Sequence, residues 1–150
     1  MTEVTIIINK EEVYEEVAQT TSYTGAKMQN DEKAYDRIFT TDGDRSQLER
    51  FWNESCVAVC ETLKEFVQEE RNEKDSFTLL LSLSSAFDPA LEPAMKKELF
   101  SFFVTNIVCK WYVFTNKQEA GDFAASAVSM LDGVKRKVYH RRKPMRPSRK

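Results

Sequence analysis

The sequence predicts a mainly α-helical fold of the α+β class: a helical bundle that includes a two-stranded antiparallel β element and ends in a long αα-hairpin. Apolar residues recur with helical spacing over several long segments. Two short segments instead have the composition or the alternation of strands. A length of 150 residues suits one domain, which we expect over residues 1–139, followed by a basic extended tail over 140–150.

Two segments are predicted to be strands. Residues 2–8 are rich in β-branched side chains, which favour extended backbone. Over residues 77–84, apolar side chains alternate with polar ones, the period of a strand with one buried face. Because a lone strand is unstable in water, we expect these two segments to pair with each other.

Two helices are predicted in the first half of the chain. The first covers residues 10–19, with Asn9 as its N-cap. Loop-like composition follows at 20–25, and a short helical turn is expected over 33–39. The second helix is predicted over 45–70, where apolar residues keep helical spacing as far as Val67.

The second half of the chain predicts the αα-hairpin. Asp88 and Pro89 are an N-cap and a first helical residue, and they begin a third helix that runs to about Phe114. A fourth helix covers 117–139 and has a stripe of small and apolar residues. The link at 115–116 is so short that the two helices should lie antiparallel.

The third helix carries more aromatic surface than a four-helix core requires. Its aromatic side chains lack the interleaved basic residues of a base-stacking surface. We therefore expect most of them in the core and some at a contact with another copy of the chain. The residues predicted for this oligomer interface are Phe100, Phe103, Trp111 and Tyr112.

Composition excludes several classes of protein. The start of the chain lacks the basic and apolar regions of a signal peptide, and the longest apolar stretch, 99–114, is too short and too polar to cross a membrane. Three cysteines without a secretory signal are not a disulfide framework, and a single histidine leaves a zinc site short of ligands. We expect a soluble cytoplasmic protein with free thiols and no bound metal.

The search for catalytic chemistry finds no candidate set. His140 lies inside a basic run near the end of the chain, where a catalytic base would lack rigid support. The four glycines stand apart, so there is no phosphate-binding loop. We expect no enzyme activity, no cofactor and no small-molecule substrate.

Charge is distributed very unevenly along the chain. Nine of the 22 Lys and Arg residues lie between Lys135 and Lys150, a segment without acids. The rest of the chain contains the other 13 Lys and Arg residues and all 24 Asp and Glu residues, which gives it a net charge of −11. Such segregation is typical of proteins that interact through their charged end.

The basic tail allows three interpretations. It could be a solubilising end that also suits the helix dipole. It could contact nucleic-acid phosphates with release of counterions. It could dock in an acidic groove of another protein, and Pro144 and Pro147 favour an extended conformation for this. The residues predicted to bind a partner are Lys137, Tyr139, His140, Arg141, Arg142, Lys143, Arg146, Arg149 and Lys150.

Residues 110–120 (KWYVFTNKQEA), the alanine-rich helix after them and residues 136–144 (RKVYHRRKP) resemble uncharacterised proteins of phage-like elements in gut Bacteroidales. The general plan is similar to the head–tail connector, or neck adaptor, proteins of tailed phages. Those are small helical subunits that form a ring beneath the portal and send a C-terminal segment into it.

The resemblance implies a structural subunit of a phage-like particle, located in the virion after assembly in the bacterial cytoplasm. It implies a homo-oligomeric ring whose partner is a portal-like or tail protein, with a tail-completion protein as a close variant. The alternative function is a nucleic-acid-binding accessory protein that uses the same basic tail.

Overall fold

A small antiparallel sheet forms one side of the molecule in the computed structural model, which describes residues 1–27 and 40–144. Strand β1 (Thr2–Asn9) pairs with β3 (Ser76–Leu83), which confirms the predicted pairing. The register places Ile6 beside Leu79 on the buried face of the sheet. The predicted helical turn over 33–39 lies outside the described residues.

The sheet has three strands where the sequence predicted two. Helix α3 (Arg45–Thr62) ends well before residue 70, and β2 (Val67–Asn72) follows it and pairs with β3, giving the order β1-β3-β2. The predicted helix over 45–70 is therefore wrong beyond Thr62. Apolar side chains at Leu63, Phe66 and Val67 continue the helical spacing, but hydrogen bonding to β3 decides the conformation.

Helix α1 (Lys10–Lys27) is longer than predicted and includes the residues expected as a loop at 20–25. Two of their hydroxyl groups are satisfied within the helix, because Thr21 Oγ1 donates to the Val17 carbonyl at 3.0 Å and Thr24 Oγ1 to that of Thr20 at 3.0 Å. Thr21 is also fully buried and accepts a hydrogen bond from the Thr40 amide. Tertiary packing thus extends a helix that composition alone would end.

The start of α1 follows the sequence prediction. The Asn9 side chain accepts a hydrogen bond from the Glu12 amide at 3.1 Å, as an N-cap does. We expect Asn9→Ala to lower the free energy of unfolding by about 1 kcal/mol because this amide loses its partner. Urea denaturation measures the loss, Asn9→Asp should retain most of the stability, and an unchanged midpoint in Asn9→Ala would contradict the cap.

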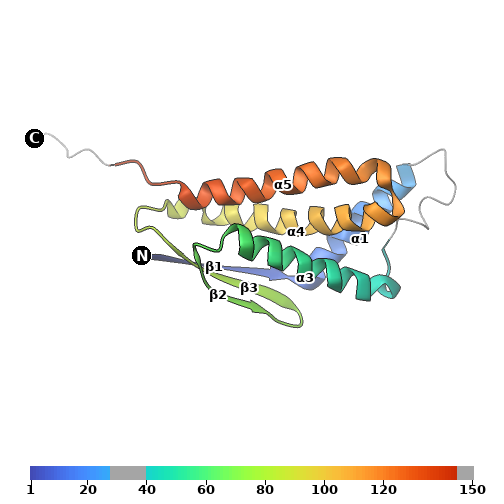
Figure 1. The fold of residues 1–150 in the computed structure, drawn as a ribbon, viewed down its shortest axis with the longest axis horizontal. Coiled ribbons are helices and arrows are strands. Elements are labelled where there is room, and N and C mark those ends of the chain that lie inside the picture. The colour runs from blue at the N-terminus through green and yellow to red at the C-terminus, as the bar shows by residue number, and fades with distance from the viewer. Residues whose placement is uncertain (28–39, 145–150) are drawn as a thin grey trace, which may run out of the picture.

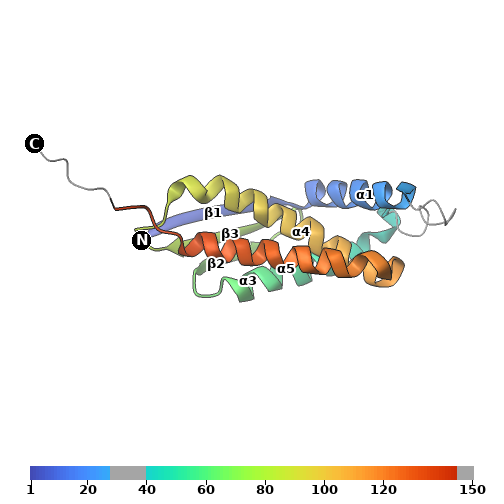
Figure 2. The same ribbon diagram turned by 90° about the horizontal axis from the view of Figure 1, so that it is seen from above.

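The αα-hairpin comprises α4 (Glu92–Thr115), which follows a short 3₁₀ turn η2 (Pro89–Leu91), and α5 (Lys117–Tyr139). The two helices run side by side in both views (Figures 1 and 2). Asp88 accepts a hydrogen bond from the Ala90 amide at 3.1 Å, which confirms the predicted cap at the start of this region. A second 3₁₀ turn, η1 (Asp42–Asp44), precedes α3.

The elements stack in layers with the sheet at one side, α3 and α4 across its inner face, and α5 outermost (Figure 1). The buried core lies between the sheet and these helices and includes Trp52, Leu79, Phe103 and Tyr112. On the outer face of the sheet, no described helix covers the strands (Figure 1). Within the described residues, no helix is long and apolar enough to cross a membrane.

Candidate interaction surface at the C-terminal arm

The basic tail, here called the C-terminal arm (residues 140–150), is described as far as residue 144. Helix α5 ends at Tyr139, and His140 adopts extended backbone angles, φ −70° and ψ 131°. The described part of the arm leaves at the end of the molecule where β1 begins (Figures 1 and 2). The extended tail that the sequence predicts over 140–150 is thus described only in its first five residues.

The first residues of the arm are fixed to the rest of the chain. The Arg142 amide donates to the Ala86 carbonyl at 2.8 Å, and Arg141 forms an isolated antiparallel bridge with Phe87. Phe87 is buried at 1% exposure, so the loop that receives the arm is anchored in the core. The arm therefore starts from a defined position and in a defined direction.

The side chains of the arm differ in how much they are engaged. Arg141 Nη1 donates to Ser84 Oγ at 3.1 Å, and Arg142 Nη2 donates to the Ser85 carbonyl at 3.0 Å. His140 and Lys143 are exposed, as are both arginines. Despite these contacts, the charged groups of Arg141, Arg142 and Lys143 remain at the surface, where a partner can reach them. The predicted Arg146, Arg149 and Lys150 lie outside the described residues.

Two further residues predicted to bind a partner, both on α5, also contact this chain itself. The Lys137 ammonium pairs with the Glu98 carboxylate and ties α5 to α4. Gly133 makes room for this pair, because a Cβ at that position would overlap the Glu98 carboxylate. Tyr139 is half exposed, its ring packs edge-on against Phe66 with 5.1 Å between centroids, and its hydroxyl donates to Glu65 at 3.2 Å.

The predicted oligomer interface needs a correction. Phe103 and Tyr112 have no exposed surface, so they belong to the core and cannot contact another copy. Phe100 and Trp111 are half-buried and still present some surface. Helix α4 packs against α1, α3, α5 and β1, which is why its apolar second half can be accommodated within one chain.

Apolar surface lies at positions that sequence reasoning missed. The most exposed side chains of this kind within the helices include Phe114 at 73%, Val128 at 62% and Val57 at 56%. Phe114 stacks on Phe51 with 6.5 Å between ring centroids and otherwise faces solvent. Their positions on the polar sides of the helical stripes are the signal in the sequence that could have identified them.

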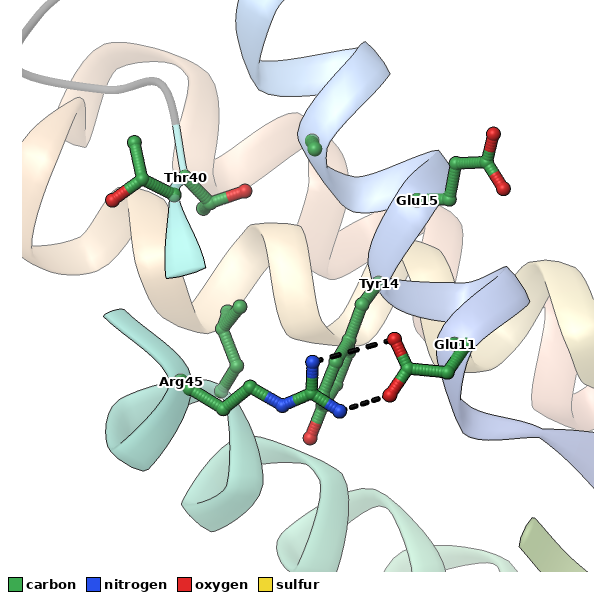
Figure 3. A pocket seen from close by; sticks show the side chains of 8 residues that line it. Glu11, Tyr14, Glu15, Thr40 and Arg45 are labelled. Atoms are coloured by element: carbon green, nitrogen blue, oxygen red, sulfur yellow. Dashed lines mark hydrogen bonds and ion pairs between the residues drawn. The ribbon is translucent and has the colours of Figure 1, made fainter. Parts of the chain in front are cut away.

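A pocket between α1 and the start of α3 is shown in Figure 3. The Arg45 guanidinium forms an ion pair with Glu11 and lies over the Tyr14 ring, 4.9 Å from its centroid. The Arg45 hydrogen bond lowers the pKa of the Glu11 carboxyl, so the pair is ionised at neutral pH. With Glu15 adding negative charge, the pocket does not favour anions, and its ion pair joins α1 to α3.

The cysteines are free thiols, with Cys56 buried and Cys60 half-buried on the same side of α3. Burial raises the pKa of the Cys56 thiol to about 12. Burial also raises the pKa of Cys60 to about 12, helped by a hydrogen bond to Glu70. Thiols with such a pKa are protonated at neutral pH and are poor nucleophiles. Among the described side chains, no three potential metal ligands gather at one place.

The raised pKa of Cys56 predicts a loss of stability in alkali. The unfolded thiol ionises near pH 9, whereas the folded one keeps its proton to about pH 12, so its contribution falls as pH rises between these values. At pH 10.5 this contribution should be smaller by about 2 kcal/mol than at pH 8. The destabilisation caused by Cys56→Ala, measured by urea denaturation, should shrink by that amount, and an equal effect at both pH values would contradict the shift.

No family model, curated protein or solved structure matches this chain.

Proposed function

We propose that this chain is a structural subunit of a phage-like particle, and more specifically a head–tail connector that forms a ring and docks its basic arm into a portal-like protein. The observation that carries the proposal is the fixed start of the arm. The Asp88 amide donates to the His140 carbonyl and the Arg142 amide donates to the Ala86 carbonyl, so the first residues of the arm are held beside residues 86–88. A subunit that must reach a neighbour gains from such an arm because less order has to be created on binding.

The distribution of charge supports the same role. Outside residues 135–150 the chain carries a net charge of −11, and exposed acids such as Glu12, Glu15 and Glu16 contribute to it. The body of the protein therefore repels polyanions, whereas the arm attracts acidic surfaces. In a connector, an acidic body suits a channel through which DNA passes without adhering.

A ring requires that copies of the chain associate. A head-to-tail interface that closes on itself generates a ring, and apolar surface at Val57, Phe114 and Val128 is available for such contacts. We expect sedimentation velocity at micromolar concentrations to reveal a closed oligomer, and electron microscopy to reveal rings. A chain that is monomeric both alone and on its portal-like partner would contradict this proposal.

The second candidate is a nucleic-acid-binding accessory protein, which the exposed cations Arg141, Arg142 and Lys143 favour. Each phosphate contact would release counterions, so the affinity for DNA should fall steeply as salt increases. We expect only weak binding to duplex DNA at physiological salt, because the acidic body opposes it. Tight binding that disappears in a chain ending at Lys143 would favour this second function over the connector.

A further inference from the structure

The sheet presents two edges that differ in character. In the order β1-β3-β2, strands β1 and β2 each have one side without a partner strand among the described residues. Proteins usually protect such edges with proline, a bulge, charged side chains or short length. The eight residues of β1 have no proline, lysine or bulge, and Glu3 is their one charged residue. This edge is therefore free to accept a further strand.

A groove beside the β1 edge is apolar and carries charges of both signs, since Glu12 lines it together with two lysines. It lies between β1 and the first turns of α4 and is lined by Ile7, Phe100 and the two lysines Lys96 and Lys97, among others. Ile7 is 63% exposed, and Phe100 is half-buried. Lys96 pairs with Glu92 at 3.4 Å, whereas Lys97 is exposed. A strand that paired with β1 would bring its side chains to this groove.

The β2 edge carries more acids than bases, and within it Arg71 pairs with Glu69 at 3.1 Å. Its pairing with β3 is irregular between Val67 and Glu69. Glu69, Glu70 and Glu73 are exposed on β2 and the turn after it. Glu70 pairs in register with the buried Leu79, so its side chain lies on the face of the sheet that the helices cover. Lys96 and Lys97 of α4 also lie on that face, beside β1. The two edges therefore carry complementary charges on the same side of the sheet.

We propose that copies of this chain associate head-to-tail through their sheets, with the β1 edge of one copy pairing with the β2 edge of the next. Charge at two positions favours this pairing over the symmetric alternatives, because β1 against β1 would bring together Lys97 of both copies, and β2 against β2 would bring together Glu70 of both copies. Pairing the unlike edges brings Glu70 toward Lys97 instead. Both strands run antiparallel to β3, so the new pair would be parallel.

This inference rests on the ring-forming role proposed above and gives it an interface. A contact between two different surfaces can repeat from copy to copy. The assembly closes into a ring if a whole number of the rotations between copies makes one full turn. The twist of a sheet supplies such a rotation. Within one chain Thr5 and Glu69 both lie level with Leu80. In a sheet continued without stagger, they would lie about 5 Å apart in adjacent copies.

Cysteine cross-linking tests the pairing, with the full chain used in two forms that a tag makes distinguishable in size. We would mix Thr5→Cys chains with Glu69→Cys chains, and in parallel with Arg71→Cys chains in case the strands are staggered by two residues. Mild oxidation should give a mixed disulfide dimer, because neighbouring strands meet the geometric requirement of a disulfide. Either variant alone should give none, and Ser126→Cys, at an exposed position of α5, is the control.

A charge reversal provides an independent readout. Lys97→Glu should abolish the oligomer in sedimentation velocity, and Lys97→Glu combined with Glu70→Lys should restore it. Both positions are exposed, and unchanged circular dichroism would confirm that the variants fold. Assembly that Lys97→Glu leaves unaffected would overturn the role assigned to this edge.

The outcomes separate this inference from the proposal on which it rests. Dimers of Thr5→Cys with itself would overturn the head-to-tail pairing in favour of a symmetric one. Rings of the wild-type chain without mixed cross-links would overturn the sheet interface but leave the connector proposal in place. A wild-type chain that is monomeric under all conditions would overturn both.

Discussion

Replacement of Trp52 by alanine is expected to lower the free energy of unfolding by about 4 kcal/mol. Trp52 has no exposed surface and packs against Phe103 with 4.8 Å between ring centroids. It also meets Tyr14 edge-on at 6.3 Å, and its indole Nε1 donates to Asn72 Oδ1 at 3.1 Å. Alanine would leave a cavity between α3, α1 and α4 and remove one of the hydrogen bonds that tie α3 to β2.

Urea denaturation of three variants tests this prediction. Trp52→Phe should lose less than Trp52→Ala because most of the volume is retained, although the hydrogen bond to Asn72 is not. Trp111, the other tryptophan, is half-buried, and Trp111→Ala should cost less than half as much. Equal losses at the two tryptophans would contradict the position of Trp52 at the centre of the core.

Loss of the Glu49 charge is expected to destabilise the chain by about 2 kcal/mol, because it leaves a buried ammonium group without its partner. Lys10 is 4% exposed, and its Nζ lies 2.9 Å from Glu49 Oε2 and 5.4 Å from the centroid of a Trp52 ring. The Glu49 side chain is 37% exposed, so solvent screens the interaction and reduces the effect below that of a fully buried pair.

A double-mutant cycle isolates the contribution of this pair. Glu49→Gln and Lys10→Met should each lower the free energy of unfolding. The double variant should lose less than the sum of the two, because Lys10→Met removes the charge that Glu49→Gln leaves without a partner. The exposed pair of Arg50 with Glu54 is the control, and Arg50→Gln should change stability by less than about 0.5 kcal/mol. Additive losses at Lys10 and Glu49 would show that the two groups do not interact.

Local patterns in the sequence predicted the elements that are amphipathic or clearly capped. Alternation over 77–84 identified β3, and the Asp88–Pro89 signal identified the start of the αα-hairpin. The local patterns did not predict the elements whose conformation depends on tertiary contacts. Strand β2 is charged and has one half-buried apolar residue, Val67, so no local pattern distinguishes it from an exposed helix end.

The candidate surface was predictable in its location but not in its contacts. The run of Lys and Arg from residue 135 onward identified the basic end, and Pro144 and Pro147 predicted an extended conformation for its last part. The bridge between Arg141 and Phe87 joins segments far apart in the chain, and no sequence pattern indicates it. Burial of Phe103 and Tyr112 likewise depends on how many elements surround α4, which a single helix cannot reveal.

The most direct test of the proposed function is affinity capture from producing cells, at low and high salt, with bound protein and nucleic acid both identified. The baits are the full chain, a chain ending at Tyr139, and a chain with Arg146, Arg149 and Lys150 replaced by glutamine, which keeps the contacts that fix the arm at Ala86 and Ser85. Our account predicts that the full chain retains a portal-like protein at high salt and that both altered baits lose it. Capture of nucleic acid alone, released by high salt, would contradict it.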